Sequence, residues 1–145
     1  MSTDANKALV RRYYDEVLNR GDLAVVDELL APEFVSHAPS GATFGLEQYR
    51  QTIAMSRGAF PDLHVVVEAQ LAEADRVVTR WTARGTHTGA FMGLPPSGRQ
   101  VSVSAIHIHR IAGRRVVEHW EQIDALGLLQ QLGALPAPGQ AQPSR

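Results

Sequence analysis

Histidines and carboxylates gather in one short stretch of the chain, from Val101 to Gln122. Residues 101–110 alternate between apolar and polar side chains, and residues 114–122 do so more loosely, which predicts two adjacent strands joined by a short turn. The titratable side chains of these strands include His107, His109, Glu118, His119 and Glu121. A carboxylate in an apolar wall can take a proton from an activated carbon while a histidine polarises a carbonyl oxygen. The stretch therefore predicts one wall of a pocket with acid–base chemistry.

The turn between the two predicted strands decides which side chains face this pocket, because a one-residue shift moves every side chain to the opposite face. A two-residue turn at 112–113 would turn His107 and Glu121 to opposite faces. A three-residue loop at 111–113 has glycine in third place, where a left-handed backbone is needed. We prefer this loop, which pairs residue 110 with 114, Val103 with Glu121 and Ala105 with His119. The face that it predicts carries Ala105, His107, His109, Val117, His119 and Glu121.

Glu121 is the leading candidate for the catalytic acid–base group, and His107 for the group that polarises a carbonyl. Burial in an apolar wall disfavours the charged carboxylate, so we expect a raised pKa for Glu121. A structural alternative is a glutamate that faces solvent or a partner subunit and pairs with an arginine. Asp124 is the second candidate carboxylate, and its alternative role is to cap a helix predicted over 126–132.

Several other side chains can line the cavity behind such a wall. Those expected to bind substrate are His37, Tyr14 or its neighbour Tyr13, Trp81, Phe91, Met92 and His119. Phe91 and Met92 stand in a loop that can close over an apolar ligand, and His119 can orient Glu121. Packing in the core or against a partner subunit is the alternative for each of them.

Helices and strands must position these residues. Along the chain, the sequence predicts helices in the first part and strands in the second. Helical spacing predicts one helix from Thr3 or Asp4 to Asn19, a shorter one after Asp22 that ends near Pro32, and a third over 46–57. A strand or bend at 33–37 and strands over 63–73 and 76–86 precede the two strands described above. This order indicates an α+β fold, with helices packed on one face of a curved, mostly antiparallel sheet. A hollow between the two layers is the expected ligand site.

Composition narrows the class of protein. The 145 residues suit one domain, and the absence of cysteine excludes disulfides and thiolate chemistry. A formal net charge of −1 without a basic run argues against nucleic acid as a partner. No apolar run is long enough for a membrane span, and the polar N-terminus is not a signal peptide. We expect a soluble cytoplasmic protein without a membrane partner, with a domain over 1–133 and a mobile tail over 134–145.

Five motifs together resemble the SnoaL-like polyketide cyclases of the nuclear transport factor 2-like superfamily. They are GTHTG at 85–89, MGLPPSGR at 92–99, HIHRI at 107–111, EHW at 118–120, and Asp124 followed by LQQLG at 129–133. The resemblance covers residues 5–133. It implies a cone-shaped α+β barrel, often a homodimer, that works without a metal or cofactor on a small apolar or polyketide-like substrate. In the cyclases it implies an aldol ring closure on a polyketide ester.

The same resemblance places the general acid–base carboxylate at Glu121 and a pocket histidine at His107. The chain departs from the cyclases in having Glu121 in place of aspartate and Ala105 in place of a polar amide. Ser36 or His37 stands where they have a polar residue near the end of the second helix. A cofactor-free hydroxylase or hydratase of the same family and a non-catalytic ligand-binding dimer stay open as alternatives.

A metal site is the remaining alternative for the histidine-rich strands. Two histidines at i and i+2 on one strand can chelate an ion with a third ligand from the next strand. The set would be His107, His109, His119 and Glu121. The helical first third of the chain and the resemblance argue against it, so we predict no metal.

Overall fold

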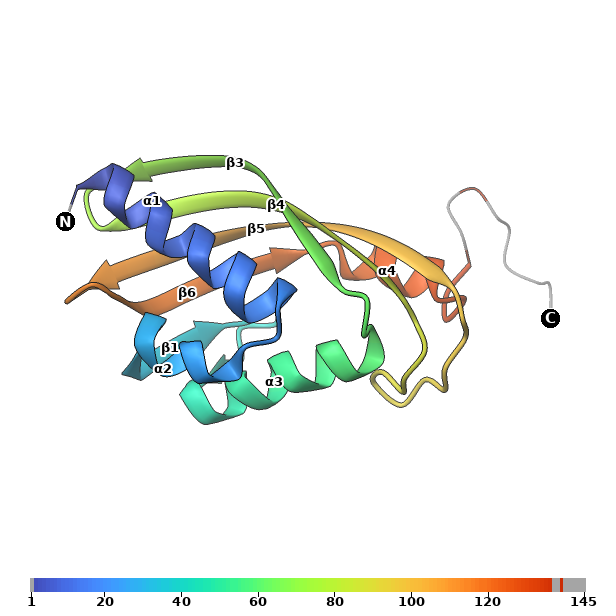
Figure 1. Cartoon of the computed structure of the whole chain (residues 1–145). Helices are drawn as coiled ribbons and strands as arrows, with labels where there is room; N and C mark the ends of the chain where they lie inside the picture. Colours follow the sequence, from blue (N-terminus) through green and yellow to red (C-terminus); the bar gives the residue numbers. More distant parts are fainter. Residues whose placement is uncertain (1, 137–138, 140–145) are drawn as a thin grey trace.

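Six strands form one curved sheet, with helices α1 to α3 on one side of it (Figure 1). The computed structural model describes residues 2–136 and 139. The strands are β1 (Leu30–His37), β2 (Thr43–Phe44), β3 (His64–Glu73), β4 (Arg76–Thr86), β5 (Gln100–Ala112) and β6 (Arg115–Ile123). Their order is β2-β1-β6-β5-β4-β3, and all neighbours are antiparallel except β1 and β6. The predicted α+β fold is confirmed.

The helices also follow the predicted order. They are α1 (Thr3–Arg12), α2 (Val26–Leu29), α3 (Leu46–Ala59) and α4 (Ala125–Gln131). A π-helical segment, η1 (Tyr13–Asn19), continues α1, and a 3₁₀ turn, η2 (Leu23–Val25), precedes α2. Of the predicted mobile tail, residues 137–138 and 140–145 lie outside the described range.

The first helix differs from the prediction at its start and in its second half. Ser2, not Thr3 or Asp4, caps it, because the Ser2 hydroxyl accepts a hydrogen bond from the Ala5 N–H at 3.0 Å. From Tyr13 onward the helix is π-helical, so each turn takes in more residues than an α-helix does. Tyr13 and Tyr14, the first two residues of this segment, are both fully buried.

Strand β1 begins earlier than expected. The sequence predicts Pro32 at the end of the second helix or in the turn just after it, but the helix ends at Leu29 and Pro32 lies inside β1. Pro32 is exposed and falls between Leu30 and Val35, where the register with β6 shifts. Its missing N–H therefore interrupts no paired position of the ladder.

The turn between β5 and β6 differs from both predicted turns. Gly113 and Arg114 form a two-residue turn, since Ala112 pairs with Arg115. Both turn residues have positive φ, 59° and 63°, as tight hairpins require. The predicted three-residue loop is therefore wrong, and so are the pairs Val103–Glu121 and Ala105–His119.

A β-bulge nevertheless restores the predicted face. The two-residue turn alone would put residue 107 opposite 120. Between the pairs Ile111–Val116 and Arg110–Glu118, the extra residue Val117 shifts the ladder by one position. His107 consequently pairs with Glu121, and His109 pairs with His119. The four polar side chains share the concave face, as predicted.

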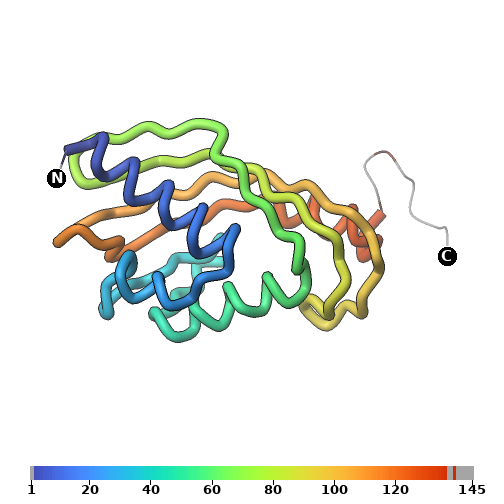
Figure 2. The backbone as a smooth tube through the Cα atoms, in the orientation of Figure 1, coloured from blue at the N-terminus to red at the C-terminus, as the bar shows by residue number. Residues whose placement is uncertain are grey.

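Two apolar clusters meet on this concave face. The larger one packs α1, η1 and α3 against the sheet around Tyr13, Tyr49 and Trp81. The smaller one gathers Phe60, Val101, Val103, Leu128 and Leu132 with Phe91 from the β4–β5 loop. That loop bends back to the end of α3 (Figure 2), where the N–H groups of Thr88 and Gly89 donate to the Ala59 carbonyl at 3.0 and 3.1 Å.

Candidate active site

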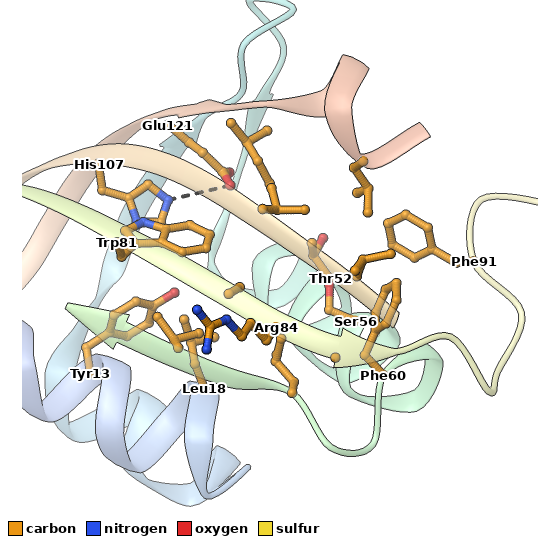
Figure 3. Close-up of a pocket in the computed structure, with 18 of the residues that line it drawn as sticks. Tyr13, Leu18, Thr52, Ser56, Phe60, Trp81, Arg84, Phe91, His107 and Glu121 are labelled. Atoms are coloured by element: carbon orange, nitrogen blue, oxygen red, sulfur yellow. Dashed lines mark hydrogen bonds and ion pairs between the residues drawn. The ribbon is translucent and has the colours of Figure 1, made fainter. Parts of the chain in front are cut away.

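A cavity of about 160 Å³ lies where the two apolar clusters meet (Figure 3). Its lining comes from η1, α3, the concave face of the sheet, the β4–β5 loop and α4. The lining residues are Tyr13, Leu18, Tyr49, Thr52, Ser56, Phe60, Leu63, Val65, Trp81, Ala83, Arg84, Gly85, Phe91, Val101, Val103, His107, Glu121, Ile123 and Leu128. Most of these side chains are apolar, so the few polar groups among them decide how a ligand is oriented.

The hydrogen bonds of His107 fix the position of its ring proton. Trp81 Nε1 donates to His107 Nδ1 at 3.1 Å, and the Tyr14 hydroxyl lies 2.8 Å from the same nitrogen. Because an indole N–H can only donate, Nδ1 must be the acceptor. The neutral ring therefore carries its proton on Nε2. That nitrogen is buried and has no hydrogen-bond partner in the described part of the chain.

Glu121 lies directly across the strand pair from this proton. Its carboxylate oxygen Oε1 is 3.6 Å from His107 Nε2, and its side chain retains 26% of its exposure (Figure 3). Burial pushes the pKa of Glu121 up, but the attraction of its carboxylate to the facing Nε2–H of His107 outweighs burial and lowers the pKa. The expected raised pKa is therefore wrong. The burial of Glu121 is as predicted, but the neighbouring His107 reverses the effect of burial on the pKa.

Two further histidines form a layer behind His107. The His119 ring stacks on the His107 ring at 4.8 Å with 16° between the planes, and its Nε2 lies 2.7 Å from the Ser36 hydroxyl. His109 stands edge-on to both rings. Burial lowers the pKa of His109 and His119 well below the ordinary value, with a further contribution from His107. Both rings are therefore neutral and support His107 by packing.

The structure brings five of the sequence-predicted residues to the cavity wall. These are Glu121, His107, Trp81, Phe91 and Tyr13, the neighbour of Tyr14. Tyr14 and His119 lie behind the wall, where each contacts His107. Their expected contact with substrate becomes a supporting role.

Three other predicted residues lie outside the cavity lining. The Asp124 carboxylate accepts a hydrogen bond from the Gly127 N–H at 2.9 Å, so it caps α4. His37 points to the outer face, where its Nε2 lies 2.6 Å from Glu118 and its ring stacks on Trp120. Met92 remains 71% exposed. The cavity lining also holds residues that the sequence analysis does not predict, among them Thr52 and Ser56 of α3 and Arg84 of β4.

The helix α3 carries the clearest missed signal. Thr52, Ser56 and Phe60 face the cavity and follow one another at spacings of four. Tyr49 and Ile53 form the buried side of this helix, and the small polar residues lie next to that side.

The histidine-rich layer does not fit a metal ion. Ligand atoms of His107, His119 and Glu121 lie within 4.8 Å of one another. However, the two rings stack face to face, and imidazole lone pairs lie in the ring plane. The lone pairs therefore lie in two nearly parallel planes, and no single ion position lies in both. Because Trp81 donates to Nδ1 of His107, Nε2 of that ring carries a proton and has no lone pair to offer an ion.

A curved sheet whose concave face holds a carboxylate–histidine pair in an apolar cavity defines a small α+β protein with an internal ligand site. No helix among the described residues is long and apolar enough to cross a membrane. The sequence profile of the SnoaL-like polyketide cyclases matches residues 8–132. The chain belongs to this family and is an enzyme of the polyketide cyclase type.

Individual relatives agree with this assignment. The nogalonic acid methyl ester cyclase of Streptomyces nogalater is 28% identical over 79% of this chain and 88% of its own length. The aklanonic acid methyl ester cyclase DnrD of Streptomyces peucetius is 30% identical over 92% of both chains. The crystal structure of AclR from Streptomyces galilaeus, a proposed hydroxylase, superposes with a TM-score of 0.86 at 34% identity, covering 94% of this chain and 85% of AclR.

Proposed function

We propose that this protein closes a ring by an intramolecular aldol reaction on an apolar polyketide ester, without a bound cofactor. The observation that carries the proposal is the His107–Glu121 pair, with 3.6 Å between a ring nitrogen and a carboxylate oxygen at the wall of an apolar cavity. The methyl ester cyclases among the relatives support the choice of substrate class.

Glu121 is the base of the proposed reaction. Because the pKa of its carboxyl group is lowered, it is ionised at neutral pH. It takes a proton from the carbon between two carbonyl groups, where the C–H bond is acidic. The Nε2–H of His107 donates to the oxygen that becomes the enolate. The enolate carbon then attacks a second carbonyl carbon of the same molecule, and Glu121 returns its proton to the new alkoxide.

The test is turnover of aklanonic acid methyl ester and nogalonic acid methyl ester by the purified protein. Ring closure adds no atoms, so the product has the mass of the substrate and differs in chromatographic retention and absorbance. We expect Glu121→Gln to lower kcat by about 10²–10⁴-fold and His107→Ala by about 10²-fold. Asp124→Asn is the control, since asparagine caps a helix as well as aspartate does. Full turnover by Glu121→Gln would refute the assignment.

Hydroxylation is the second candidate, favoured by the similarity to AclR. Hydroxylation places one atom of O₂ in the product and, with two electrons from an added reductant, releases the other as water. The product mass then rises by one oxygen atom, and the product carries the label when ¹⁸O₂ replaces air. A product of unchanged mass supports cyclisation, whereas a labelled product supports hydroxylation.

We further propose that two copies associate through the outer face of the sheet. Large apolar side chains on that face are exposed, namely Val66 (41%), Leu71 (73%) and Ile106 (47%). Across a two-fold axis both copies contribute the same surface, so apolar side chains would be buried against apolar side chains. The dimer would leave the cavity on the opposite, concave face free.

A further inference from the structure

Helix α3 turns one line of side chains toward the cavity. Ser56 follows Tyr49 by about two helical turns, so the two side chains leave the helix in nearly the same direction. Tyr49 is buried, and its ring lies 4.9 Å from that of His119, the ring that stacks on His107. Both Tyr49 and Ser56 line the cavity. The side chain of Ser56 therefore points inward, about 10 Å further along the helix than the level of the histidines.

The hydroxyl group of Ser56 is placed differently from that of Thr52, one turn before it. Thr52 Oγ1 donates a hydrogen bond to the Gln48 carbonyl at 3.0 Å, as hydroxyl groups in helices often do. The corresponding bond from Ser56 to the Thr52 carbonyl is absent from the described residues, and the half-buried Ser56 side chain borders the cavity instead. The hydroxyl proton of Ser56 is therefore available to a ligand.

An apolar stretch separates Ser56 from the reacting pair. Phe60 packs against Gly85 of β4, and Ser56 lies one helical turn before Phe60. Figure 3 shows Ser56 next to Phe60 and away from His107. On the concave face, the side chains that line the cavity between the level of His107 and that of Gly85 are Trp81, Ala83, Val103 and Ile123. The single N–H of Trp81 is already bonded to His107.

A ligand held by the His107–Glu121 pair must therefore extend along apolar side chains before it meets Ser56. Resting on the proposed function, we propose that Ser56 forms a substrate subsite, in which its hydroxyl donates a hydrogen bond to an oxygen substituent on the end of the substrate that does not react. The ligand class is an extended apolar ring compound with a dicarbonyl group at one end and an ether, carbonyl or phenol oxygen on the order of 10 Å away. Ser56 is then a specificity-determining residue.

The physical basis of this selection is the cost of removing an oxygen atom from water. In an apolar cavity the ligand oxygen loses its hydrogen bonds to water, and the Ser56 hydroxyl replaces one of them. Without that donor the oxygen stays buried and unpaired, which costs about fivefold or more in affinity. A ligand without the oxygen has no such bond to lose.

Two naphthyl diketones of equal size test the subsite by binding alone. Both carry an acetoacetyl group on one ring, and the far ring carries a methoxy group in one compound and an ethyl group in the other. Isothermal titration calorimetry gives the Kd of each. Ser56→Ala should weaken binding of the methoxy compound about fivefold or more relative to the ethyl compound. Alanine is the better helix former, so the variant keeps α3 intact.

Two further variants isolate the hydroxyl of Ser56. Ser104→Ala removes an exposed hydroxyl from the outer face of β5 and should leave the ratio of the two Kd values unchanged. Thr52→Ala should have a smaller effect than Ser56→Ala, because the Thr52 proton is bonded to Gln48. An unchanged ratio in Ser56→Ala overturns the proposal, and so does an equal loss in Thr52→Ala.

The subsite and the proposed function can fail separately. If Ser56→Ala shifts the ratio as expected while neither methyl ester is turned over, the proposed function fails and the subsite stands. If the esters are turned over while the ratio does not respond to Ser56→Ala, the subsite fails and the proposed function stands.

Discussion

The indole Nε1–H of Trp81 donates a hydrogen bond to Nδ1 of His107 at 3.1 Å. Strand β4 holds Trp81 next to β5, where Trp81 pairs with Ala105, two residues before His107. This bond determines which nitrogen of His107 carries the proton at the cavity wall. The orientation of the proposed donor therefore depends on a residue that has no reactive group of its own.

Removing this donor should impair catalysis without removing a reacting group. We expect Trp81→Phe to lower kcat about tenfold, because the Tyr14 hydroxyl still restrains Nδ1. The double variant with Tyr14→Phe should lose about 100-fold. ¹⁵N NMR of His107 measures the tautomer directly. A double variant that keeps the Nε2–H tautomer and the full kcat would contradict this role.

The loop residue Phe91 should contribute to substrate binding, and Met92 should not. Phe91 lines the cavity and contacts the Phe60 ring edge-on at 5.3 Å, whereas Met92 is exposed. We expect Phe91→Ala to raise KM several-fold, because an apolar contact with the ligand is lost. Met92→Ala is the matched control from the same loop. Equal KM values in the two variants would argue against a loop contact with substrate.

The buried histidines should make the fold sensitive to acid. In the folded state the pKa values of His109 and His119 lie well below 6.5, the ordinary value they approach in the unfolded chain. The unfolded chain binds more protons below that pH, so the free energy of unfolding is full above about pH 6.5 and falls as the pH is lowered. The slope is up to about 1.4 kcal/mol per pH unit for each histidine.

Urea denaturation across the range from pH 5 to 8 tests this dependence. His109→Leu should flatten the curve, because a side chain that cannot bind a proton replaces one of the two buried rings. His64→Leu removes an exposed histidine and should leave the slope unaltered. If both variants keep the slope of the unmodified protein, the acid sensitivity has another origin.

The proposed dimer predicts a change of mass in solution. Ile106→Glu places a charge in the outer-face patch, and two copies of it face each other across a two-fold axis. We expect the unmodified protein to elute as a dimer and Ile106→Glu as a monomer in size-exclusion chromatography with light scattering. A monomeric unmodified protein would rule out the dimer.

Much of the fold follows from local patterns in the sequence. The helical stripe with Tyr13, the alternation in β4 and the cap at Asp124 are all local features, and each appears in the structure. The position of His37 is not a local feature. It depends on the parallel pairing of β1 with β6, which joins segments some 80 residues apart. That pairing turns Ser36 inward to His119 and His37 outward to Glu118.

The shared face of His107 and Glu121 was predicted correctly for a reason that was incorrect. Two deviations from the predicted hairpin cancel, namely the tighter turn and the bulge at Val117. The alternation of apolar and polar residues predicts which side chains share one face of the sheet. It does not predict which turn and which bulge set the register of the two strands. The lowered pKa of Glu121 was missed for a related reason, since its sign depends on a contact across the pair.

The bulge at Val117 also gives the hairpin tolerance to a change in its length. Loss of any one residue from 115 to 117 would straighten the strand, and residue 118 would still meet 110. Chain length can therefore vary at this end of the ribbon while the acid–base pair keeps its partner. A second deletion in the same segment has no spare residue to absorb it and would turn the carboxylate to the outside of the sheet.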